Sequence, residues 1–140
     1  MKIREYASLP EDAKRIREEV FVEEQGFCNE FDDTDDIAMH YLLFSEDGEA
    51  AAVARTYRED GCQDEILGRV AVRKQYRGRG VGSRMLREVE RLLREKGATG
   101  IRLHAQSAAQ DFYRRLGYEP FGEEDYDESV LHIWMRKDLS

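Results

Sequence analysis

Three glycines at alternate positions, Gly78, Gly80 and Gly82, lie between a stretch with strand periodicity and a stretch with helix periodicity. Before them, residues 65–73 carry β-branched residues on one face, as a half-buried strand does. After them, apolar residues recur three and four positions apart, as on one face of a helix. A glycine-rich turn between a strand and a helix exposes backbone N–H groups at the positive end of the helix dipole, so it favours an anionic ligand.

Fixed charge around the turn supports this interpretation. Arg77 and Arg79 lie within it, and residues 73–102 hold 10 Lys and Arg against 3 Asp and Glu, although the whole chain has a net charge of -8. The overall acidity argues against a general binder of nucleic acid or anionic membranes. A Walker A turn requires Gly-Lys-Ser/Thr and a dinucleotide turn requires G-x-G-x-x-G, and neither pattern is present. The turn itself leaves the identity of the anion open.

The rest of the sequence predicts a mixed α/β fold in one domain, residues 1–140, because 140 residues with 41% hydrophobic content suit one core. The predicted strands are Lys2–Tyr6, Ile37–Ser45, Ala50–Arg58, Glu65–Arg73, Ile101–His104, Tyr118–Gly122 and Val130–Met135. The predicted helices are Pro10–Glu24 with Ser8 as its cap, Val81–Lys96, and Ala109–Leu116. The connection through the second helix predicts that strands 65–73 and 101–104 are parallel neighbours. An irregular segment, 26–36, and an acidic turn, 123–128, complete the pattern.

The motif Gln75-x-x-Gly78-x-Gly80 resembles the signature of the GNAT superfamily of acetyl-CoA-dependent N-acetyltransferases. A second stretch, residues 109–118 (Ala-Gln-Asp-Phe-Tyr-Arg-Arg-Leu-Gly-Tyr), is also similar to the family and follows in the family's order. The resemblance covers nearly the whole chain and indicates a small single-domain member. It implies the GNAT fold, a mixed, mostly antiparallel central sheet with flanking helices, in which the fourth and fifth strands are parallel and splayed apart.

The resemblance also implies that acetyl-CoA is the co-substrate. Backbone N–H groups of the turn would bind the pyrophosphate, and the preceding strand would pair with the pantetheine arm. Tyr113 would be the general acid that protonates the departing CoA thiolate, and a core tyrosine is the alternative interpretation. Gln106 departs from the asparagine that many members have there, but its side chain can still bond the cofactor. The implied cofactor-binding residues are Val70, Ala71, Val72, Arg77, Gly78, Arg79, Gly80, Val81, Gly82, Ser83, Gln106 and Tyr113.

Acetyl transfer to an amine also requires a base. An amine with a pKa of about 10 is protonated at neutral pH, so a side chain or a chain of waters must remove a proton before the amine attacks the thioester. The candidate bases are Glu24, Glu65, His40 and His104, and the sequence does not choose among them. For His104 a structural, hydrogen-bonded histidine is the alternative interpretation. The histidines and cysteines lack the spacing of a metal site, so no metal is expected.

The acceptor is expected to be a primary amine of a small molecule or a peptide, attacked in a ternary complex. The acidic run Asp32–Asp36 is either a solvated loop or, with Glu23 and Glu24, a negative field that attracts a cationic amine. The alternative function is a non-catalytic acyl-CoA-binding sensor with the same fold. The presence of Tyr113 weighs against the sensor.

The cysteines and the N-terminus predict the compartment. Cys28 and Cys62 form no CxxC pair, which favours free thiols in a reducing environment. The N-terminal residues lack an apolar signal segment, and the longest charge-free run, Ile37–Ser45, is nine residues long. We therefore expect a cytoplasmic protein that binds neither membrane nor nucleic acid. Whether it is a monomer or a homodimer stays open.

Overall fold

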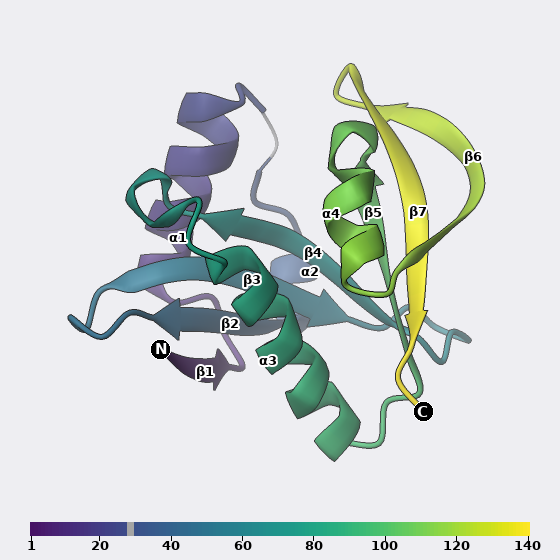
Figure 1. The fold of residues 1–140 in the computed structure, drawn as a ribbon, viewed down its shortest axis with the longest axis horizontal. Helices are drawn as coiled ribbons and strands as arrows, with labels where there is room; N and C mark the ends of the chain where they lie inside the picture. Colours follow the sequence, from purple (N-terminus) through teal and green to yellow (C-terminus); the bar gives the residue numbers. More distant parts are fainter. Residues whose placement is uncertain (28–29) are drawn as a thin grey trace.

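A seven-stranded sheet with the order β1-β2-β3-β4-β5-β7-β6 forms the centre of the computed structural model, which describes residues 1–27 and 30–140 (Figure 1). Cys28 therefore lies outside the described residues. The mixed α/β architecture agrees with the predicted fold class. The strands are β1 (Lys2–Tyr6), β2 (Met39–Phe44), β3 (Ala50–Tyr57), β4 (Glu65–Val72), β5 (Gly100–Gln106), β6 (Glu119–Asp127) and β7 (Val130–Asp138).

β4 and β5 are the parallel pair in this sheet, and the other strand pairs are antiparallel. The two strands pair over three positions, from Glu65 opposite Ile101 to Leu67 opposite Leu103. Beyond Leu67 their ladder ends although both strands continue. This geometry confirms the predicted splay, and it opens the sheet at the ends of β4 and β5.

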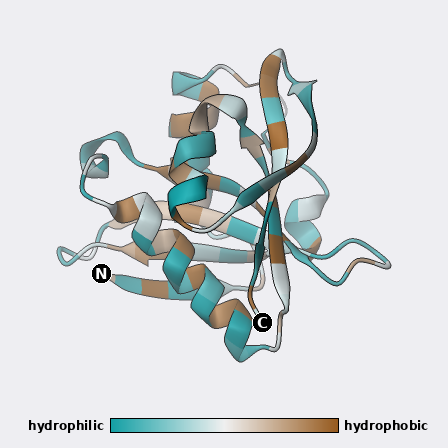
Figure 2. Cartoon of the chain, turned by 45° about the vertical axis from the view of Figure 1, so that its right-hand side comes forward, coloured by the Kyte–Doolittle hydropathy of each residue, from teal (hydrophilic) through white to brown (hydrophobic). Residues whose placement is uncertain are grey.

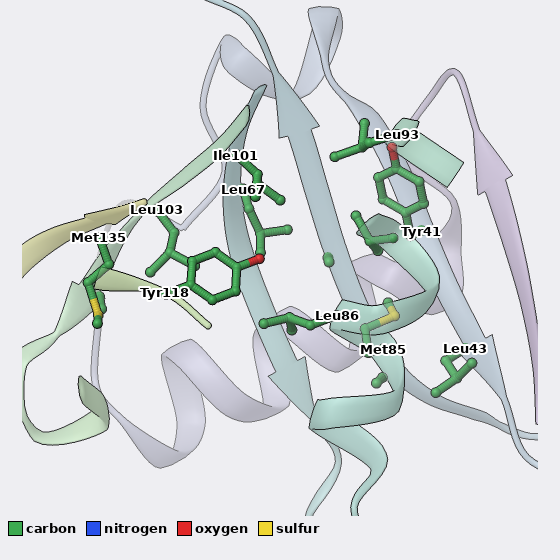
Figure 3. Close-up of a cluster of buried hydrophobic side chains, with 14 of the residues drawn as sticks. Tyr41, Leu43, Leu67, Met85, Leu86, Leu93, Ile101, Leu103, Tyr118 and Met135 are labelled. Carbon is green, nitrogen blue, oxygen red and sulfur yellow. The ribbon is translucent and has the colours of Figure 1, made fainter. Parts of the chain in front are cut away.

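Helices cover both faces of the sheet. The helical segments are α1 (Glu11–Arg17), the π-helix η1 (Glu18–Glu24), α2 (Thr34–Ile37), η2 (Lys74–Tyr76), α3 (Val81–Glu95), η3 (Ser107–Ala109) and α4 (Gln110–Arg115). α3 and α4 pack on one face over a core that includes Tyr41, Leu86 and Met135, and Figure 3 shows part of this cluster. α1 packs on the other face. Because neighbouring strand residues point to opposite faces, Leu42 joins the core under α1 while Tyr41 joins the core under α3.

α3 shows most clearly why these residues form a helix against the sheet. Its apolar residues, spaced by three and four, are buried, and its arginines are exposed, so hydrophobic and hydrophilic residues alternate along the helix in Figure 2. Gly97, with a φ of +87°, ends the helix in the left-handed conformation that suits glycine. Among the helices of residues 1–27 and 30–140, none is long and apolar enough to cross a lipid bilayer.

The first predicted helix needs two corrections. Its buried stripe is present at Ala13, Ile16 and Val20, but Ser8 does not cap it. The N-cap is Pro10, which has extended backbone and no side-chain cap bond, so the helix begins at Glu11. From Glu18 onward the backbone is π-helical, a geometry that is rare and often found near functional sites.

The predicted acidic turn at 123–128 is also wrong. β6 continues through it to Asp127, and the chain reverses at Glu128 and Ser129, which have φ values of +48° and +69°. A register shift between Phe121 and Asp125 absorbs the extra residues as a bulge. β6 is an exposed edge strand, so its acidic side chains remain in solvent and do not prevent strand formation.

Candidate functional site

The glycine-rich turn connects the end of β4, through η2, to the start of α3. Gly78 and Gly80 have φ values of +77° and +73°, and a Cβ atom at either position would meet nothing within 4 Å. Backbone conformation, not crowding, therefore requires glycine here. Gly80 is the N-cap of α3 and supplies no side-chain cap, so the first N–H groups of this 15-residue helix are open to a ligand.

Gly82 and Ser83 follow directly, in the first turn of α3. A Cβ atom at Gly82 would lie 3.3 Å from the Phe112 Cζ and 3.6 Å from the Val72 Cγ2. This glycine therefore allows α3, α4 and β4 to approach one another closely beside the turn. Val81 is buried and fixes the start of α3 on the core.

Charges at the turn are only partly neutralised. Arg77 donates hydrogen bonds from Nε to the Val72 carbonyl at 2.9 Å and from its Nη atoms to both oxygens of Glu24. Arg79 is exposed and has no ion-pair or hydrogen-bond partner in the described part of the chain. An anion at the turn would therefore meet two guanidinium groups. That of Arg77 is paired with Glu24, and that of Arg79 is unpaired among the described residues.

A cavity of about 630 Å³ lies where β4 and β5 separate. Its walls come from both strands, from η1, from α4 and from β7. Of the predicted cofactor residues, Val70, Gln106 and Tyr113 line it, whereas Ala71 is buried under α1 and offers only its backbone. Gln106 donates from its side-chain nitrogen to Gln25 at 2.9 Å, which joins the end of β5 to the end of η1.

A bulge in β4 faces this cavity. Gly68 pairs with Arg55 and Ala71 pairs with Val53, so Arg69 and Val70 together occupy one position of the ladder with β3. Arg69 has a φ of +52°, which is unusual for a residue with a side chain. β5 does not pair with this part of β4, so backbone groups of the bulge are available to a ligand.

Tyr113 packs against the core and also lines the cavity. Its ring packs against the core and against Phe112 and Tyr118, with centroid distances of 5.0 and 5.8 Å. Its side chain also lines the cavity, and within residues 1–27 and 30–140 its hydroxyl has no hydrogen-bond partner. Burial raises the pKa of Tyr113 to about 12, so the phenol keeps its proton at neutral pH.

Two of the predicted bases are engaged elsewhere. The Glu24 carboxylate is bound by Arg77, and that hydrogen bond lowers its pKa, which makes it a poorer proton acceptor. Glu65 lies at the opposite end of β4 from the bulge, where it pairs with Arg58 outside the cavity. Neither residue lines the cavity, so the geometry favours neither as the base.

The two histidine candidates differ in position. His40 is buried, and its Nε2 donates to the Asp35 carbonyl at 2.9 Å, away from the cavity. His104 lines the cavity. Its neighbours Leu103 and Ala105 join the core under α3, so His104 points to the opposite face of the sheet from Tyr113.

The acidic run Asp32–Asp36 is not a free negative field. Asp35 is buried and accepts hydrogen bonds from Arg17 and Arg55, and Asp32 pairs with Arg55. Burial by itself raises the pKa of Asp35, but the bonds from the two arginines outweigh it and lower the pKa to about 2. Asp35 is therefore not part of a solvated loop, whereas Asp32 is exposed but paired with an arginine.

The arginines that hold this segment were not among the predicted functional residues. Arg17 is fully buried and also bonds Glu30, and Arg69 of the β4 bulge bonds the Glu30 carbonyl at 3.1 Å. One signal was present, because Arg17 continues the buried stripe of Ala13 at the i+4 position. This network ties the segment after η1 to the bulge.

Comparison with known proteins assigns residues 10–139 to the family described as an acetyltransferase (GNAT) domain. The chain is 35% identical over 131 residues to the uncharacterised N-acetyltransferase YjcF of Bacillus subtilis, with 91% of each chain covered. A crystal structure of a candidate N-acetyltransferase from Lactobacillus plantarum matches with a TM-score of 0.91 at 30% identity, covering 99% of this chain and 98% of that one. Escherichia coli ElaA matches with a TM-score of 0.81 at 26% identity, covering 97% and 98%. The chain therefore belongs to the GNAT family of acetyltransferases and is an acyltransferase.

Proposed function

We propose that this protein transfers the acetyl group of acetyl-CoA to a primary amine by direct attack in a ternary complex. The observation that carries the proposal is that Tyr113 and His104, whose side chains lie on opposite faces of the sheet, line a single cavity. A proton donor and a proton acceptor are thus available on the two sides of the opening between β4 and β5.

The residues along β4 and the turn suit a phosphorylated thioester. Backbone N–H groups of Gly78 to Gly82 and the Ser83 hydroxyl would hold the pyrophosphate, with Arg79 as an added cation. The backbone of residues 70–72 would pair with the pantetheine arm. The bulge at Arg69 and Val70 would then offer an N–H group to the thioester oxygen, where negative charge develops during attack.

Proton transfer completes the reaction. As the new C–N bond forms and the C–S bond breaks, His104 accepts a proton from the amine and Tyr113 donates its phenolic proton to the sulfur leaving group. The high pKa of Tyr113 keeps that proton on the phenol until thiolate charge appears beside it. Solvent exchange then restores both side chains.

The acceptor side of the cavity favours a cationic amine. Arg55 and Arg69 face Glu30 and Asp32, so these charges largely balance. Asp127 also lines the cavity, and its carboxylate has no ion-pair partner among the described side chains. A positively charged acceptor would be attracted to this carboxylate, which replaces the acidic run as the source of attraction.

Thiol release distinguishes the enzyme from a non-catalytic sensor. Acetyl-CoA would be titrated by calorimetry, and free CoA thiol would then be followed over a panel of polyamines, aminoglycosides and lysine peptides. We expect binding, and thiol release that depends on an amine. Binding without release for every amine would support the sensor, and absence of binding at millimolar acetyl-CoA would overturn both functions.

A further inference from the structure

We propose that Asp125 is a positioning residue that fixes the tautomer and orientation of His104, so that Nδ1 is the atom that accepts the proton. This inference rests on the proposed function, because it assigns His104 as the base. It further assigns the nitrogen of His104 that accepts the proton, and it assigns Asp125 as the side chain that orients the ring.

The contact between the two side chains sets the tautomer. His104 Nε2 lies 2.7 Å from Asp125 Oδ1. An ionised carboxylate only accepts hydrogen bonds, so Nε2 carries the hydrogen and Nδ1 keeps its lone pair. In the described part of the chain, Nδ1 has no hydrogen-bond partner. The open lone pair belongs to a side chain that lines the cavity.

Neighbouring rings fix the plane of the imidazole. His104 stacks on His132 and on Trp134, with centroid distances of 4.8 and 4.9 Å and interplanar angles of 28° and 26°. His132 does not compete for Asp125, because its Nδ1 donates to the Val130 carbonyl at 2.8 Å. With ring rotation restricted by these two stacked neighbours, the bond to Asp125 determines which nitrogen remains free.

The bulge in β6 brings Asp125 to this position. Phe121 pairs with Trp134, and a regular ladder would therefore put Glu123 opposite His132. Two additional residues in β6 put Asp125 there instead, and Gly122, with a φ of +74°, allows the deviation. β7 lies between β5 and β6, so Asp125 reaches across it to His104 (Figure 1).

The ion pair is not needed to hold the fold together. The Asp125 side chain is 56% exposed, and pairs this exposed contribute little to stability. Loss of Asp125 should therefore leave the protein folded. Glu123, in the same strand, is exposed and has no partner among the described residues, so it offers a matched change of charge.

The test compares Asp125→Ala, Asp125→Glu and Glu123→Ala with the parent, using acetyl-CoA and an amine that supports thiol release. We expect Asp125→Ala to lower kcat roughly 10-fold, less than the 10²–10⁴-fold typical of a whole general base, with the KM for acetyl-CoA unchanged. Asp125→Glu should restore most of the rate, and Glu123→Ala should match the parent. A parental rate in Asp125→Ala, or an equal loss in Glu123→Ala, would overturn the proposal.

Nitrogen-15 NMR of the imidazoles provides a readout independent of turnover. Signals would be assigned by comparison with His104→Gln, because the chain has 3 histidines. We expect one tautomer in the parent, with the hydrogen on Nε2, and both tautomers in Asp125→Ala. A parent with the hydrogen on Nδ1 would contradict the inference. A parent that releases no thiol with any amine would instead overturn the proposed function and the catalytic role built on it, while the tautomer would still show whether Asp125 orients the ring.

Discussion

The guanidinium of Arg77 and the carboxylate of Glu24 form a paired hydrogen bond, with Nη1–Oε2 and Nη2–Oε1 distances of 2.7 and 2.9 Å. The bond joins the last residue of the π-helix to the glycine-rich turn. Arg73, just after β4, makes a similar pair with Glu19, so the π-helix is held to the segment between β4 and α3 at two points.

Glu24→Gln should strengthen acetyl-CoA binding. The substitution removes the negative charge that neutralises Arg77 beside the turn, and an anionic ligand gains from that change. We expect the KM for acetyl-CoA to fall about two- to threefold at low salt, as for one charge at roughly 10 Å in water. Added salt should abolish the difference. Glu23→Gln, a neighbouring exposed carboxylate without a partner in the described structure, should leave the KM unchanged.

Tyr113→Phe should lower kcat about 100-fold while the dissociation constant of acetyl-CoA stays the same, because only the proton donor is lost. Stopped-assay thiol release and calorimetry would measure the two quantities. Tyr126→Phe makes the same chemical change at a tyrosine that is 73% exposed, and its kcat should not change. Equal rates for Tyr113→Phe and the parent would remove this phenol from the mechanism.

Activity should not decline between pH 7 and pH 10 through loss of the Tyr113 proton. The phenol must be protonated to donate, and burial raises its pKa to about 12. Deprotonation would therefore reduce the rate only as the pH approaches that value. The pH dependence of kcat at saturating amine and acetyl-CoA tests this expectation, and a decline centred near pH 10 in the parent that Tyr113→Phe lacks would contradict it.

Gly80→Ala and Gly97→Ala should separate binding from stability. Both glycines have positive φ, +73° and +87°, at opposite ends of α3, and neither has an atom near the position of a new Cβ. Each alanine should therefore cost about 1–2 kcal/mol of unfolding free energy in urea titrations. Only Gly80→Ala should raise the KM for acetyl-CoA, because only Gly80 shapes the turn. An equal effect of Gly97→Ala on KM would count against the turn as the phosphate site.

Asp35 should make the fold sensitive to acid. Its pKa in the folded protein, about 2, is below the ordinary value of 3.8, so its stabilising contribution is present above about pH 4 and is lost as the pH falls towards 2. Asp35→Asn leaves the buried Arg17 and Arg55 short of a charged partner, at a cost of about 3–5 kcal/mol at pH 7. Urea unfolding at pH 7 and at pH 3 would show a smaller gap between parent and variant at pH 3. A constant gap would show that Asp35 is not the titrating group.

Patterns within short stretches of the sequence predicted the elements whose formation depends on neighbouring residues. The glycine-rich turn at 78–82, the stripe that places α3 on the sheet, and the parallel relation of β4 and β5 all follow from residues close together in the sequence. The network at Asp35 was not predictable in this way, because its partners Arg17 and Arg55 lie 18 and 20 residues away.

The hydrogen-bond partner of His104 could not be predicted from the sequence, for a related reason. Periodicity places His104 on a strand, but the identity of the carboxylate opposite it depends on the register of β6 on β7. The two additional residues of the bulge determine whether Glu123 or Asp125 lies opposite His132, and the pattern of the sequence does not show that the bulge is present. Glu24 and Glu65 were plausible by residue type, but both lie outside the cavity, and the arginine that pairs with Glu24 comes from 53 residues away.

The short ladder between β4 and β5 divides the sheet into two halves. Three residue pairs, ending at Leu67 and Leu103, connect the half formed by β1 to β4 with the half formed by β5, β7 and β6. A rotation of a few degrees about these pairs would widen or narrow the gap between Val70 and Ala105 without altering any wall residue. The width of the opening between β4 and β5 therefore depends on the relative orientation of the two halves of the sheet as well as on the side chains that line it.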